Sequence, residues 1–60
     1  MNREQLWQLF GTLDDALRCV EVKTDAEKLD RDDLLAEFST QPEAALLAMV
    51  RRIRELVAGL

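Results

Sequence analysis

The residues of this sequence that could carry chemistry lie mainly in two charged clusters. The first is acidic and occupies the stretch from Asp25 to Asp33, where only Lys28 and Arg31 carry positive charge. Its carboxylates are Asp25, Glu27, Asp30, Asp32 and Asp33. Carboxylates in such a run can form an acidic docking surface or imitate nucleic-acid phosphates. They can also simply cap helices, because the helix dipole favours negative charge at an N-terminus. We take Asp30, Asp32 and Asp33 as candidate partner-binding residues.

Arg51, Arg52 and Arg54 form the only basic cluster. At about 100° per helical residue, Arg51 and Arg54 lie on one side of an apolar stripe and Arg52 lies on the other. Arginines beside an apolar seam commonly pair with carboxylates of a neighbouring helix, and the acidic segment offers such carboxylates. Recognition of a partner protein is the second interpretation. Nucleic-acid binding is the third, and the net charge of −4 opposes it.

Trp7 is the only tryptophan, and it lies off the main apolar stripe. It either packs against a middle helix or stays exposed on a contact surface, where tryptophan is enriched as a binding anchor. Arg3 could cover its ring in either case. Cys19, the only cysteine, lies beside the stripe and is expected to be a reduced, buried core residue.

Several kinds of catalytic or metal site lack their residues. The sequence contains no histidine and a single cysteine, so neither a closed zinc site nor a histidine-activated nucleophile can form within one chain. No glycine-rich phosphate loop is present, and the acidic segment lacks the central glycine and closing glutamate of an EF-hand. We therefore expect no catalytic residue, no metal ligand and no cofactor.

Two apolar stripes at helical spacing indicate the elements that would position these residues. Each follows the +4, +3, +4, +3 order of an amphipathic helix. The first stripe is Leu6, Phe10, Leu13, Leu17 and Val20, and the second is Leu46, Val50, Ile53, Val57 and Leu60. Leu13 and Ile53 lie at the centres of these stripes and are expected to be core residues.

The first helix is expected to run from about Arg3 to Val22. Asn2 is a good N-cap, and Gln5 stands where a capping-box partner would. The phase of the stripe is kept across Gly11-Thr12, which favours one continuous helix over a kink or a second start there.

Two further N-terminal signals lie in the acidic segment. Thr24 with Glu27, or Asp30 with Asp33, could begin a middle helix within Asp25 to Phe38. This helix either fills that span or is short, from about Asp32 to Phe38.

The last helix is expected from about Gln41 to Ala58. Thr40 is the expected N-cap with Glu43 as its capping-box partner, and Pro42 falls in the first turn, where its missing N–H costs nothing. Gly59 marks the end of the helix.

These elements predict an all-α fold: residues 1–60 form a single helical domain of two long amphipathic helices, packed antiparallel, with a shorter acidic middle helix. So small a core supplies only a few kcal/mol, and the wide stripes predict that a homodimer completes the bundle. No segment could span a bilayer, so we expect a cytoplasmic protein. The expected function is that of a non-enzymatic regulator, adaptor or inhibitor that binds another protein through Trp7 or the acidic segment. The alternatives are a dimeric nucleic-acid-linked regulator that uses the arginines, and an accessory subunit of a larger complex.

Overall fold

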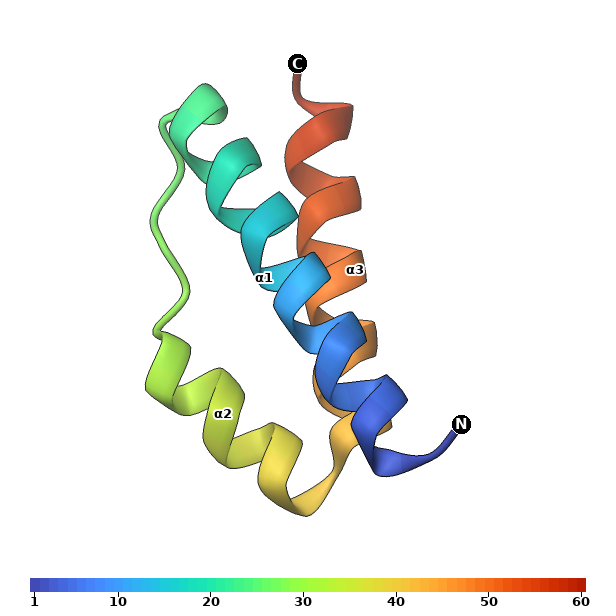
Figure 1. The fold of residues 1–60 in the computed structure, drawn as a ribbon. Coiled ribbons are helices and arrows are strands. Elements are labelled where there is room, and N and C mark those ends of the chain that lie inside the picture. The colour runs from blue at the N-terminus through green and yellow to red at the C-terminus, as the bar shows by residue number, and fades with distance from the viewer.

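The computed structural model describes residues 1–60 and contains three helices and no strand. They are α1 (Arg3–Thr24), α2 (Arg31–Thr40) and α3 (Pro42–Ala58), as Figure 1 shows. The all-α fold with two long helices and a shorter middle helix is therefore confirmed. None of the three helices combines the length and the apolar content needed to cross a membrane.

Helix α1 begins as the sequence predicts. The Asn2 side chain accepts a hydrogen bond from the Gln5 amide at 2.8 Å, and the Gln5 side chain accepts one from the Asn2 amide at 3.0 Å. The helix is continuous through Gly11 and runs two residues past the expected end, closing at Asp25 in the left-handed conformation (φ 55°). Thr24 lies inside it and donates its hydroxyl to the Val20 carbonyl at 2.7 Å, so the expected cap at Thr24 is wrong.

Gly11 is a site where helix stability can be raised. It is exposed in mid-helix, and a Cβ added there would meet no atom within 4 Å. Glycine in a helix interior costs roughly 0.5–1 kcal/mol relative to alanine. We expect Gly11→Ala to raise the free energy of unfolding by about that amount, measured by urea titration followed by circular dichroism. A variant less stable than the wild type would contradict a straight, exposed helix at this position.

Helix α2 takes the shorter of the two predicted forms. Its N-cap is Asp30, whose side chain accepts a hydrogen bond from the Asp32 amide at 2.8 Å. Asp32 and Asp33 lie in its first turn, where the helix dipole favours negative charge. Residues 25–30 form a non-helical connection between α1 and α2, which we call the strap.

The start of α3 differs from the expected capping box. Thr40 is still part of α2 and donates its hydroxyl to the Glu37 carbonyl at 3.2 Å. Gln41 is the N-cap and makes no side-chain capping bond, so the Thr40–Glu43 pair is wrong. A single residue between two helices leaves no room for Thr40 to take the extended conformation that an N-cap requires. Pro42 opens α3 and Gly59 closes it, as expected.

Helices α1 and α3 lie side by side and parallel, which corrects the antiparallel arrangement expected from the sequence (Figure 1). The C-terminal ends of both helices line one hollow, with Thr24 on one side and Leu56 and Gly59 on the other. The reason is chain length. The 22 residues of α1 rise about 33 Å, and the strap with the 10 residues of α2 spans roughly the same distance back. The chain thus begins α3 beside the start of α1.

The core lies where α3 packs against both other helices. Its fully or nearly buried members are Leu6, Phe10, Leu17, Leu34, Phe38, Ala45, Leu46 and Met49. The predicted stripes are correct in period, but the buried faces are rotated from them. On α3 the face is turned toward Met49, leaving Val57 49% exposed, and Leu60, which follows the end of the helix, is 75% exposed.

On α1 the buried face is rotated toward Asp14 and Glu21, both of which are buried. Cys19 therefore faces away from the core and is exposed, so its expected role as a buried core residue is wrong. Leu13 and Ile53 are only partly buried and pack against the edge of the core instead of forming its centre.

Candidate functional site

Three aromatic rings join α1 to α2 at the N-terminal end of α1. Trp7 stacks on Phe10, with ring centroids 5.5 Å apart and an interplanar angle of 5°. Phe38 of α2 packs edge-on against Phe10 at 5.1 Å and lies tilted against Trp7 at 5.6 Å. Phe10 and Phe38 are buried, whereas Trp7 remains 50% exposed. Trp7 therefore packs against α2, as the first interpretation expects, and it also faces solvent, while its use as a contact surface stays a prediction.

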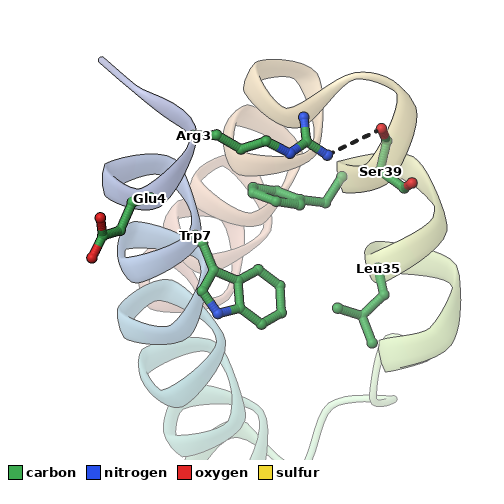
Figure 2. A pocket seen from close by; sticks show the side chains of 6 residues that line it. Arg3, Glu4, Trp7, Leu35 and Ser39 are labelled. Carbon is green, nitrogen blue, oxygen red and sulfur yellow. Dashed lines mark hydrogen bonds between the residues drawn. The ribbon is translucent and has the colours of Figure 1, made fainter.

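A groove of about 370 Å³ opens beside the exposed part of Trp7. Its lining residues come from the first turns of α1 and the second half of α2: Arg3, Glu4, Trp7, Leu35, Phe38 and Ser39. Figure 2 shows Trp7 and Leu35 facing one another across this opening, while the Glu4 carboxylate points away from it. We call this feature the Trp7 groove.

Arg3 forms the charged rim of the Trp7 groove. Its guanidinium lies 5.8 Å from the centroid of the Phe38 ring and donates a hydrogen bond to the Ser39 carbonyl at 3.4 Å (Figure 2). The expectation that Arg3 covers the Trp7 ring is therefore wrong, because the arginine reaches across to α2 and leaves the indole open. An exposed guanidinium with one long hydrogen bond keeps donors available for a carboxylate.

The chemistry of the groove is that of a binding surface. Its floor is aromatic and aliphatic, and its rim carries the Arg3 cation. The lining offers no nucleophile paired with a base and no set of carboxylates around a metal position. The arrangement suits one large apolar side chain held next to a negative group.

The other predicted partner-binding residues lie away from this groove. Asp30, Asp32 and Asp33 are exposed at the opposite end of α2, as cap and first turn. Within the chain they make no ion pair with the arginines of α3, and pairing between the two clusters across an assembly stays a prediction. The hydrogen bond between α3 and the strap goes to the backbone, because Arg52 donates to the Glu27 carbonyl.

The three arginines of α3 do not act as one cluster. Arg52 is half-buried, donates to the Glu27 carbonyl at 3.4 Å and lies 3.8 Å from Glu55. Arg51 and Arg54 are exposed and have no ion-pair partner in the chain. The predicted separation of Arg52 from Arg51 and Arg54 is thus consistent with the structure.

A buried ion cluster at the edge of α1 was not anticipated from the sequence. Glu21 is 1% exposed; its carboxylate accepts one hydrogen bond from Arg18 at 2.7 Å and another from the Leu29 amide at 2.9 Å. Asp14 lies 3.4 Å from Arg18 and 3.7 Å from Arg31. These contacts fasten the strap and the start of α2 to α1. The sequence does contain a pattern that indicates this cluster: Asp14, Arg18 and Glu21 are spaced by +4 and +3, which places them on one side of the helix beside the apolar stripe.

The groove residues on α2 were also missed as site residues. Leu35 and Phe38 are apolar residues within the span expected for the middle helix, but nothing in their spacing places them opposite Trp7. Comparison of the chain with protein-family models, curated proteins and solved structures gives no match. The candidate function therefore rests on the groove itself.

Proposed function

We propose that this protein is a non-enzymatic adaptor or regulator that binds a partner protein through the Trp7 groove. The observation that carries the proposal is the half-exposed Trp7 ring, fixed by two buried phenylalanines at the mouth of an apolar groove. A rigid aromatic ring that is already ordered loses little conformational entropy on binding. Tryptophan is also among the residues that most often dominate binding energy at interfaces.

The partner contributes a large apolar side chain next to an acidic residue. The apolar side chain, leucine or phenylalanine, packs between Trp7 and Leu35, which face one another across the groove. The neighbouring carboxylate pairs with Arg3, whose planar guanidinium suits a carboxylate better than an ammonium group would. Binding there makes a charge-assisted hydrogen bond in addition to apolar burial.

The groove alone supports weak binding. Burying one leucine or phenylalanine side chain is worth about 1.5–3 kcal/mol, and a surface ion pair adds about 1 kcal/mol or less. A stable complex therefore needs contacts around the groove as well. Ser39 is exposed and lines the groove, and the exposed surface of α2 around it would form the rim of such an interface.

Selection of peptides from a random library tests the proposal. The library is selected on the wild-type protein and depleted on Trp7→Ala, and the retained peptides are titrated while Trp7 fluorescence is followed. We expect the retained peptides to share a leucine, phenylalanine or tryptophan beside an aspartate or glutamate. Arg3→Gln should remove the preference for the acidic residue and keep the preference for the apolar one.

Val22→Ala is the matched control, because Val22 is a 67% exposed apolar residue on the same helix, far from the groove. It should bind the selected peptides as the wild type does. Circular dichroism establishes that each variant is folded. Depletion on folded Trp7→Ala that removes every peptide selected by the wild type would overturn the proposal, as would a selection that yields no shared apolar residue.

A further inference from the structure

A second stripe runs along the outer side of α3 and was not used in forming the core. It consists of Glu43, Leu47, Val50 and Arg54, spaced by +4, +3 and +4 so that all four lie on one side of the helix. Leu47 is 49% exposed and Val50 is half-buried, while Glu43 and Arg54 are exposed. We call these residues the α3 outer stripe.

The α3 outer stripe faces away from α2. Arg52 lies on the side of α3 opposite to the stripe, and it donates a hydrogen bond to the Glu27 carbonyl of the strap. On α1, Trp7 marks the edge that meets α2, and Leu9 and Leu13 lie on the other edge, partly buried against the core. Because α1 and α3 are parallel neighbours, Leu9 and Leu13 widen the apolar surface beside the stripe.

The order of residues along the stripe is self-complementary. Its two ends carry opposite charges, and its two central residues are aliphatic. When a second copy lies antiparallel across it, Glu43 meets Arg54 of the other copy and Leu47 meets Val50. The same contacts then occur twice, as a two-fold symmetric interface requires. Neither Glu43 nor Arg54 has an ion-pair partner within the chain.

We infer that the protein forms a two-fold symmetric dimer through antiparallel contact of the α3 outer stripes, with Glu43 paired to Arg54 of the other copy. A second copy fits this surface because one patch supplies both charges in the order that the interface needs. The dimer leaves the Trp7 groove free, because that groove lies at the contact of α1 with α2. Dimerisation therefore places two Trp7 grooves on one assembly and stands independently of the proposed function.

Charge reversal at either end of the stripe tests this arrangement. In an Arg54→Glu homodimer both ion pairs become Glu–Glu contacts, and in a Glu43→Arg homodimer both become Arg–Arg contacts. Like charges placed opposite each other weaken association. We expect each variant alone to have a dimer dissociation constant at least about tenfold higher than the wild type by sedimentation equilibrium.

Mixing the two variants restores both ion pairs, because each chain then offers the charge that the other lacks. We expect the equimolar mixture to form a heterodimer with an affinity close to that of the wild type. The rescue also shows that both variants are folded, since an unfolded chain would not restore association. Lys28→Glu is the matched control: it reverses an exposed charge on the strap, which has no ion-pair partner and lies on the α2 side of the molecule, and it should leave the dimer unchanged.

Three results would overturn the inference. The first is a wild-type protein that stays at its 6.9 kDa monomer mass up to about millimolar concentration. Association increases with protein concentration, so a specific dimer would be populated under those conditions. The second is a dimer that Arg54→Glu does not weaken. The third is a mixture of the two reversed variants that remains monomeric although circular dichroism shows both to be helical, because a different register or orientation would then be required.

Discussion

Phe10→Ala is expected to leave the protein largely unfolded at room temperature. Phe10 is 1% exposed and contacts both Trp7 and Phe38, so its loss opens a cavity where α1, α2 and α3 meet. Truncating a buried phenylalanine costs about 3–5 kcal/mol. A single core of this size supplies only about that much stability. The variant should therefore show a large loss of helical circular dichroism, and the fluorescence of Trp7 should shift toward that of a solvated indole.

Leu13→Ala is the control for this prediction. Leu13 is also an apolar residue of α1 at helical spacing, but it is only partly buried at the edge of the core. It should cost clearly less stability than Phe10→Ala when both are compared at one protein concentration, because association would otherwise shift the melting temperature. Equal losses at the two positions, or a Phe10→Ala variant that melts like the wild type, would contradict the core described above.

The position of the core shows what helical periodicity can and cannot determine. The spacing of Leu6, Phe10 and Leu17 correctly predicts one long helix with an apolar face. However, the apolar residues of α1 cover a wide arc of the helix surface, so their spacing does not determine which part of that arc faces the core. Two charged residues on the buried side decide it. Arg18 and the Leu29 amide satisfy the carboxylate of Glu21, and Asp14 lies within ion-pair distance of Arg18 and Arg31 although its Oδ1 accepts no hydrogen bond. Hydrophobicity alone counts such residues as exposed.

The orientation of the helices depended on information that local patterns do not hold. Caps and turn residues indicate where elements begin, and the Asn2 and Asp30 caps are both found. They do not indicate whether the connecting segment is long enough to return to the start of α1. The antiparallel pair expected from the sequence takes no account of the length of this connection. Adding the lengths of the strap and α2 leads to the parallel pair that Figure 1 shows.

The candidate site was predictable only in part. Trp7 is conspicuous in the sequence because it is the only tryptophan and lies off the stripe. The residues that complete the groove, Leu35 and Ser39, come from another helix, and their proximity follows from the packing of Phe10 against Phe38. The spacing within one helix cannot reveal a contact between two helices.

The second large effect is expected at Glu21, whose carboxylate is the link between α1 and the strap. Glu21→Ala removes the hydrogen bonds from Arg18 and from the Leu29 amide and leaves both donors without this acceptor. Breaking a buried, hydrogen-bonded pair by removing one partner costs about 3–5 kcal/mol. Arg18 keeps partial access to water, with its side chain 28% exposed, so we expect a cost of about 3 kcal/mol. In a domain of this length that lowers the melting temperature by at least about 10 °C.

Glu21→Gln separates the two roles of this side chain. Glutamine keeps an oxygen that can accept from the Leu29 amide but loses the negative charge that pairs with Arg18. It should therefore destabilise the protein less than Glu21→Ala, and amide hydrogen exchange at Leu29 should stay slower in Glu21→Gln than in Glu21→Ala. Glu37→Gln, at an exposed carboxylate of α2 without an ion pair, should leave the melting temperature within about 2 °C of the wild type. Wild-type stability in Glu21→Ala would show that the strap is held by apolar contacts alone, with Leu29 packed against the core as its main anchor.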